Sequence, residues 1–143
     1  MRGRCGVVMI TKTILLINSE PNVREVLQAC LSHLGGWQIL STGSPSEGLQ
    51  LAARNQLDAI LFDLSTFGMN FSIFLKQLRS QPETQQIPVV LIAVEAKWLN
   101  IEPLKQFQIA GVVDYSREPA KLPQQIAKLL DWDEIPRIYE LED

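Results

Sequence analysis

Short runs of hydrophobic residues recur along the chain, and polar segments separate them. The first run, ILLI at residues 14–17, ends in the polar residues Asn18, Ser19 and Glu20. Four further runs have the length and β-branched content of buried strands; they cover residues 37–42, 58–63, 87–94 and 111–116. The run IPVVLIAV is typical of a central strand covered on both faces. The pattern therefore predicts five strands.

Amphipathic segments follow the strands, with apolar residues at helical spacing. Pro21 and Pro45 suit the first turns of two helices, and Ser44 with Glu47 has the spacing of a capping pair. The periodicity predicts helices over residues 21–34, 45–53, 71–78, 98–107 and 119–130. The fourth segment is the weakest helical pattern because Pro103 lies within it.

Five strands that alternate with five helices indicate an α/β protein with a doubly wound, five-stranded parallel sheet. Right-handed crossovers favour the flavodoxin-like strand order 2-1-3-4-5. Ligands of such sheets bind beyond the carboxyl ends of the strands, where the order reverses between strands 1 and 3. We therefore expect the loops at residues 18–20 and 63–66 to face each other.

The composition is that of a soluble globular protein. Hydrophobic residues make up 46% of the chain and charged residues 20%, and no apolar run approaches the roughly 20 residues of a membrane span. Cys5 and Cys30 lack metal-binding spacing, which favours a reduced, cytoplasmic protein. The three scattered basic residues at positions 1–12 are too few for a nucleic-acid surface. We expect neither nucleic acid nor membrane as a partner.

We divide the chain into an N-terminal extension (1–12), one domain (13–132) and an acidic C-terminal tail (133–143). Both Met1 and Met9 remain candidates for the true start. Since eleven residues follow position 132, we expect a stand-alone domain that passes its signal by docking to another protein.

Nucleotide binding and histidine-based chemistry, such as a catalytic triad or a histidine metal site, lack the residues they need. The segment TGSPSEG has glycines at positions 43 and 48, but no Gly-Lys-Ser/Thr follows and no G-x-G-x-x-G opens a helix, which disfavours nucleotide binding. His33 is the only histidine and is expected on a helix surface, away from the sheet edge. Asp63, which follows AILF at the mouth of the sheet, is the more informative residue, although a loop-capping aspartate could occupy the same place.

Four segments in register resemble the receiver domain of bacterial response regulators over nearly all of residues 13–132. These segments are ILLINSEPNVREVL, DAILFDLS, IPVVLIAVEA and GVVDYSREPAKL. The segments LGGWQIL and LPQQIAKLLDW are similar to those of small, single-domain receivers of cyanobacterial type.

The resemblance implies a phosphoryl transfer from a histidine kinase to an aspartate at the end of strand 3, which is Asp63 here. In the family, Mg²⁺ bridges the acceptor and the phosphoryl oxygens and neutralises the developing charge. The family binds this cation with two acids after strand 1, the acceptor itself and a backbone carbonyl, which would be that of Ser65. A hydroxyl, a switch aromatic and a lysine complete the family's site.

The sequence departs from the family at most of these positions. Asn18 and Ser19 replace the acid pair, so that Glu20 is the remaining acid of that loop. Ala93 replaces the hydroxyl, and Glu118 replaces the lysine. At an effective dielectric near 20, unit charges ~5 Å apart interact by roughly 3 kcal/mol. Repulsion between Glu118 and the phosphoryl group, in place of the lysine's attraction, would therefore slow phosphoryl transfer by orders of magnitude. We expect metal binding to be weak or absent, with Asp63, Glu20 and Ser65 as the candidate ligands.

Two further positions agree with the family pattern. Tyr115 matches the switch aromatic, although a tyrosine at the sheet edge also packs without any switch. The resemblance implies a cis peptide bond between Glu118 and Pro119, which an X-Pro bond permits.

Three hypotheses follow. The first is a degenerate, non-enzymatic receiver that docks to a partner without efficient phosphorylation and needs no cofactor. The second is a conventional response regulator that a histidine kinase phosphorylates on Asp63 with Mg²⁺. The third is a flavodoxin-like enzyme or small-ligand binder in which Asp63 and Glu118 share a proton or a metal.

For partners, the family commonly uses the face formed by its helix 4, strand 5 and helix 5. In this chain these elements correspond to residues 98–107, 111–116 and 119–130, and Lys97 and Trp98 precede or begin the first of them. We expect a histidine kinase or a downstream effector to bind there, and a homodimer is left open.

Overall fold

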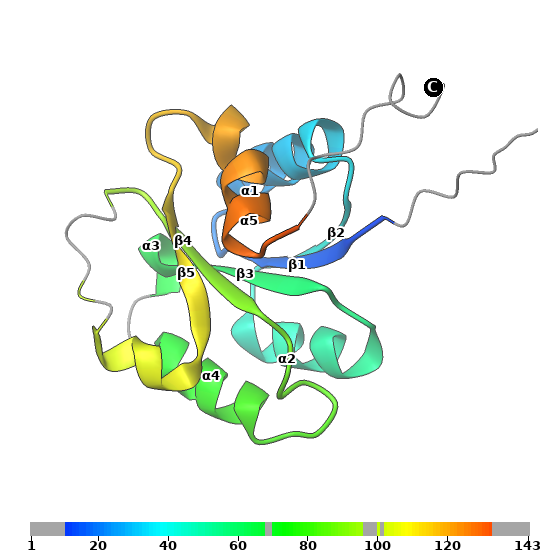
Figure 1. The fold of residues 1–143 in the computed structure, drawn as a ribbon, viewed down its shortest axis with the longest axis vertical. Coiled ribbons are helices and arrows are strands. Elements are labelled where there is room, and N and C mark those ends of the chain that lie inside the picture. The colour runs from blue at the N-terminus through cyan, green and yellow to red at the C-terminus, as the bar shows by residue number, and fades with distance from the viewer. Residues whose placement is uncertain (1–10, 68–69, 96–99, 101, 133–143) are drawn as a thin grey trace, which may run out of the picture.

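Five parallel strands form the central sheet in the predicted order β2-β1-β3-β4-β5 (Figure 1). The computed structural model describes residues 11–67, 70–95, 100 and 102–132. The strands are β1 (Thr13–Ile17), β2 (Gln38–Thr42), β3 (Ala59–Asp63), β4 (Val89–Ala93) and β5 (Ile109–Asp114). Ile17 pairs with Thr42 on one side and with Phe62 on the other, so the three strands end at one edge. The flavodoxin-like arrangement is confirmed.

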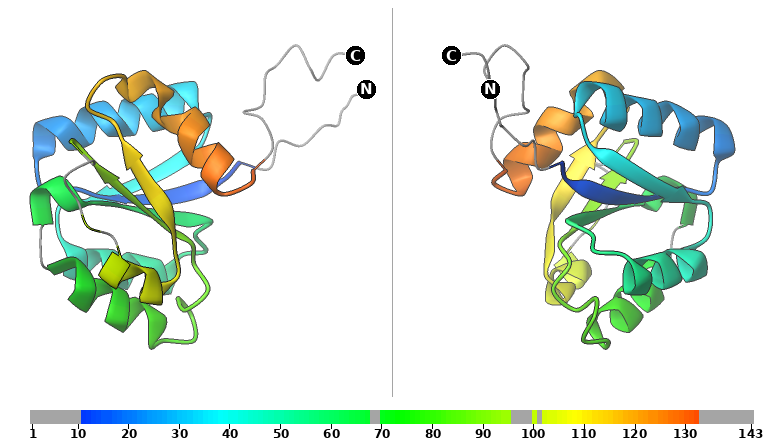
Figure 2. Two further views of the ribbon diagram at one scale, coloured as in Figure 1. Left: turned by 60° about the vertical axis from the view of Figure 1, so that its left-hand side comes forward. Right: turned by 90° about the vertical axis from the view of Figure 1, so that its right-hand side faces the viewer.

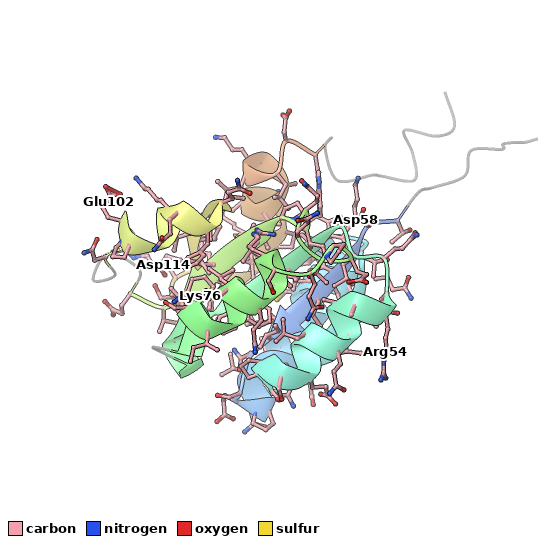
Figure 3. The ribbon with its side chains drawn as sticks, turned by 90° about the horizontal axis from the view of Figure 1, so that it is seen from below. Arg54, Asp58, Lys76, Glu102 and Asp114 are labelled. Atoms are coloured by element: carbon pink, nitrogen blue, oxygen red, sulfur yellow. The ribbon has the colours of Figure 1, made fainter. Side chains whose placement is uncertain are left out.

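Helices cover both faces of the sheet (Figure 2). On one face lie α1 (Pro21–Ala29), its π-helical continuation η1 (Cys30–Leu34) and α5 (Leu122–Leu129). The other face carries α2 (Pro45–Arg54), α4 (Asn70–Arg79) and the 3₁₀ helix η3 (Glu102–Phe107). Figure 3 shows α2 and α4 side by side across that face. No helix within the described ranges is long and apolar enough to cross a bilayer.

Alternate residues of the strands enter two separate cores. Ile14 and Leu16 of β1 pack toward α1 and α5, whereas Leu15 and Ile17 pack toward α2 and α4. All four side chains are fully buried. This two-sided burial explains why the strands read as continuous apolar runs rather than as an alternating pattern.

The predicted helix starts are confirmed at α1 and α2. Pro21 and Pro45 occupy the first turns. The Ser44 hydroxyl accepts a hydrogen bond from the Glu47 backbone N–H at 3.3 Å. The Glu47 carboxylate accepts a hydrogen bond from the Thr42 hydroxyl and so joins the end of β2 to α2.

Four of the five predicted helices form as α-helices within the described residues, and the prediction for 98–107 is wrong in type. Within the described part of that segment the 3₁₀ helix η3 begins at Glu102, so that Pro103 lies in its first turn; an α-helix over 98–107 would place Pro103 in its interior, where the missing N–H is costly. The four-residue helix α3 (Leu64–Phe67) was not predicted because it is too short to show a period. Lys97, Trp98, both candidate start residues and the acidic tail lie outside the described residues.

Arg79, the last residue of α4, joins the segments that enter β4 and β5. Its guanidinium donates to the carbonyl oxygens of Phe107 at 3.0 Å and Ile87 at 2.7 Å. It also donates to the carbonyl oxygens of Gln85 at 3.0 Å and Gln108 at 3.3 Å. One side chain therefore satisfies four backbone acceptors in the loops on this side of the sheet.

We expect Arg79→Met to lower the free energy of unfolding by about 1.5 kcal/mol, because the exposed carbonyls regain water whereas the part-buried ones do not. Urea denaturation measures this change. Arg54→Met is the control because Arg54 is an exposed residue at the end of α2 (Figure 3), where substitutions change stability by about 0.5 kcal/mol or less. Equal effects of the two variants would contradict the role of Arg79.

Candidate functional site

Three strands deliver polar side chains to one point at the carboxyl edge of the sheet. Asp63 is the last residue of β3, Asn18 directly follows β1, and Tyr115 directly follows β5. Asn18 and Asp63 are fully buried, and Tyr115 is 7% exposed. The parallel register of β1, β3, β4 and β5 places these strand ends together.

Hydrogen-bond donors surround the carboxylate of Asp63. Asn18 Nδ2 donates to Asp63 Oδ2 at 2.6 Å, and the Tyr115 hydroxyl donates to the same oxygen. The Ser65 backbone N–H donates to Asp63 Oδ1 at 2.8 Å. A buried carboxylate costs free energy unless donors of this kind satisfy it, so these contacts stabilise Asp63 in its place. The predicted meeting of the loops at 18–20 and 63–66 is confirmed by the contact between Asn18 and Asp63.

The side-chain amide of Asn18 has one orientation that fits its surroundings. Its Oδ1 accepts a hydrogen bond from the Glu20 backbone N–H at 2.7 Å. Because the oxygen is used there, the NH₂ group is the part of the amide that faces Asp63. The backbone of Asn18 is also held, since its N–H donates to the Thr42 carbonyl at 3.1 Å.

As they are arranged here, these groups fit Mg²⁺ poorly, because the cation requires hard oxygen ligands around it and Asn18 presents an amide N–H to Asp63. Asn18 Nδ2 lies 2.6 Å from Asp63 Oδ2, where the family has an acid that binds the cation. The Glu20 carboxylate accepts from the Asn22 backbone N–H at 3.1 Å and so caps α1. Within the described residues, no cluster of three or more acidic, histidine or cysteine side chains could hold a metal.

The environment of Tyr115 favours its neutral form. Burial raises the pKa of Tyr115, and the hydrogen bond and negative charge of Asp63 raise this pKa further. A hydrogen bond with Ser65 lowers it to a smaller extent. Tyr115 therefore remains a hydrogen-bond donor to Asp63 throughout the neutral pH range.

Ala93 and Ser65 lie beside this centre. Ala93 is the last residue of β4, 1% exposed, and its carbonyl accepts from the Tyr115 backbone N–H at 3.1 Å. The Ser65 hydroxyl accepts from the Val94 backbone N–H at 3.1 Å. The ends of β3, β4 and β5 are therefore joined around Asp63.

The described contact of Glu118 lies outside the group of side chains around Asp63. Its carboxylate lies 3.2 Å from Lys121 Nζ, and its side chain is 61% exposed. The described contacts of the buried Asp63 carboxylate are instead with Asn18, Ser65 and Tyr115. The structure also places His33 on the surface of η1, as predicted.

The expected cis peptide bond before Pro119 is wrong, because none of the described peptide bonds is cis. Pro119 instead begins the 3₁₀ helix η4 (Pro119–Lys121), and the Lys121 N–H donates to the Glu118 carbonyl at 3.0 Å. The Glu118–Pro119 bond therefore takes the trans form, which X-Pro bonds favour.

Sequence reasoning missed the part played by Arg24. Its Nη1 donates to the Asn18 carbonyl at 2.6 Å and thereby holds the loop after β1. A Cβ atom on Gly43 would lie 2.7 Å from this nitrogen, so the missing side chain of Gly43 makes room for the guanidinium. The sequence offered one signal, a glycine directly after β2, which the nucleotide-binding hypothesis did not explain.

Comparison with known proteins relates the chain to response regulators. No protein-family model matches it. It is 31% identical over 130 residues to the probable C4-dicarboxylate response regulator DctR of Halalkalibacterium halodurans, and the match covers 90% of this chain and 54% of that protein. It is 23% identical over 118 residues to the chemotaxis protein CheY-3 of Vibrio cholerae, covering 82% of this chain and 91% of that protein. The chain spans about half the length of the longer curated relatives that it matches.

A solved structure shares the fold. The receiver domain of the sensor histidine kinase PA1611 from Pseudomonas aeruginosa superposes with a TM-score of 0.71 at 20% identity, covering 85% of this chain and 98% of that domain. That structure has a magnesium ion coordinated in its active-site cleft.

Proposed function

The chain is a receiver domain of the response-regulator family, and on that premise we propose that it acts in two-component signalling by docking to a protein partner, without efficient phosphorylation of Asp63. One observation carries the proposal: the buried Asp63 carboxylate accepts hydrogen bonds from Asn18 and Tyr115 on the same oxygen. Phosphoryl transfer would require that carboxylate to exchange these donors for a cation and a phosphoryl group.

The charges around Asp63 also disfavour phosphoryl transfer. A carboxylate attacks a charged phosphoryl donor only if a cation offsets the repulsion between them. At this site, Asn18 and Tyr115 stabilise Asp63 without adding a positive charge. Glu118, at the position of the family's lysine, is paired with Lys121 in solvent. The absence of a positive charge among the described contacts of Asp63 therefore supports the same proposal as its hydrogen bonds do.

The alternative is a conventional response regulator that a histidine kinase phosphorylates on Asp63. The position of Asp63 at the end of β3 favours it, as does the magnesium ion in the cleft of the similar PA1611 domain. In this alternative Asp63, Glu20 and Ser65 would hold Mg²⁺ after Asn18 and Tyr115 had moved away.

In this proposal, the protein partner to which the receiver domain docks is a histidine kinase or a downstream effector. The surface we propose for it consists of η3, β5 and α5, which correspond to the family's interaction face. A homodimer is left open, and a cytoplasmic location remains part of the proposal.

Titration with Mg²⁺, followed through backbone amide resonances, separates the two functions. The docking proposal predicts no saturable shift of the Glu20 and Ser65 amides at millimolar Mg²⁺. Asn18→Asp is the matched variant, since it restores one carboxylate and should show such shifts. Saturable, site-specific shifts in the unmodified protein would favour the phosphoacceptor and overturn the docking proposal.

A further inference from the structure

The hydroxyl of Ser65 joins two parts of the site that the sequence leaves unconnected. At the end of β4 the family's hydroxyl is missing, because Ala93 stands there. The Ser65 hydroxyl is nevertheless positioned to act on the same loop, since it accepts from the Val94 backbone N–H at 3.1 Å. The backbone N–H of Ser65 donates to Asp63 Oδ1 at 2.8 Å.

The contacts close a ring around the sheet edge. From Ser65 the ring passes to Asp63, from Asp63 to the Tyr115 hydroxyl, and from the Tyr115 backbone N–H to the Ala93 carbonyl. Val94 follows Ala93 and returns to the Ser65 hydroxyl. The ring therefore ties the loops after β3, β4 and β5 to one another.

The segment that leaves β4 needs such support. Glu95 has a φ of 57°, a left-handed conformation that is unfavourable for a residue other than glycine. The preceding residue, Val94, is 41% exposed. The hydrogen bond from the Val94 N–H to Ser65 restrains the chain immediately before this strained residue.

We propose that Ser65 is a positioning residue whose hydroxyl replaces the one absent at Ala93 and holds the Val94–Glu95 segment in place beside Asp63 and Tyr115. The exposed Val94 side chain then has a fixed position at the rim of the site. This role concerns the geometry of the loop, and it holds whether or not Asp63 accepts a phosphoryl group.

Hydrogen exchange of backbone amides in Ser65→Ala, Ser65→Thr and the unmodified protein tests the role. We expect Ser65→Ala to speed the exchange of the Val94 amide by roughly fivefold, in line with the loss of one hydrogen bond. Ser65→Thr keeps the hydroxyl and should restore slow exchange. Ser80→Ala is the control, because the Ser80 hydroxyl donates to the Gln77 carbonyl on an exposed turn away from this site.

The pattern of exchange distinguishes positioning from a general loss of stability. A purely structural effect would speed the exchange of buried core amides, such as that of Ile92, together with that of Val94. The proposal predicts a change confined to Val94 and its neighbours in the ring. Unchanged exchange at Val94 in Ser65→Ala, or no recovery in Ser65→Thr, would overturn it.

Discussion

Asn18→Asp should make the stability of the domain dependent on Mg²⁺. The substitution removes the N–H donor that lies 2.6 Å from Asp63 Oδ2 and places a second carboxylate there. The lost hydrogen bond to a charged group and the new repulsion together should lower the free energy of unfolding by about 3 kcal/mol. For a domain of this size, that corresponds to a fall in Tm of about 10 °C.

Mg²⁺ should recover part of this loss because two adjacent carboxylates form a better cation site than an amide and a carboxylate. With a dissociation constant of ~1 mM, 10 mM Mg²⁺ would return about 1.4 kcal/mol, or roughly 5 °C in Tm. Differential scanning calorimetry with and without Mg²⁺ measures both effects. Gln50→Glu adds the same charge at an exposed position on α2 and should show neither the loss of stability nor the dependence on Mg²⁺. An Asn18→Asp variant as stable as the unmodified protein would refute the assigned role of Asn18.

Tyr115→Phe should cost about 2 kcal/mol of stability, because a buried carboxylate oxygen loses a charge-assisted donor while the ring keeps its packing. Chemical denaturation at pH 7 measures this loss. A Tyr115→Phe variant of unchanged stability would mean that the hydroxyl does not stabilise Asp63.

The same hydrogen bond predicts a pH dependence with a definite sign. The folded protein raises the pKa of Tyr115 above its ordinary value of 10.0. Below pH 10 the phenol is neutral in both states, and its contribution to stability is complete. Above that pH the unfolded chain ionises first, so stability should fall by about 1.4 kcal/mol per pH unit. The difference between the unmodified protein and Tyr115→Phe should therefore shrink above pH 10, and a constant difference would contradict the assignment.

The sequence was sufficient for the sheet because each strand is buried on both faces. Leu15 and Leu16 enter opposite cores, and such two-sided burial produces the apolar runs from which the five strands were predicted. The fourth predicted helix was wrong because it placed Pro103 in a helix interior, whereas the described 3₁₀ helix begins one residue before that proline. The trans bond before Pro119 differs from the expectation that family resemblance supplied.

The site shows where sequence reasoning stops. The loss of the acids at Asn18 and Ser19 was visible, but the direction of the Asn18 amide depends on the Glu20 backbone N–H, which only the folded loop supplies. Likewise, the sequence predicted an aromatic residue at Tyr115 but not its hydrogen bond to Asp63. That bond forms because β4 alone separates β5 from β3 in the sheet, which brings the ends of β3 and β5 close together. Both features are long-range consequences of the fold.

The central claim is that internal donors close the Asp63 site to phosphoryl transfer, and intact mass tests it most directly. The purified protein and the Asp63→Asn variant are each incubated with Mg²⁺ and acetyl phosphate or phosphoramidate, and the reactions are quenched. The intact masses of the two proteins are then measured by mass spectrometry. We predict that the mass of the unmodified protein does not change. A gain of one phosphoryl group that Asp63→Asn lacks would contradict the claim.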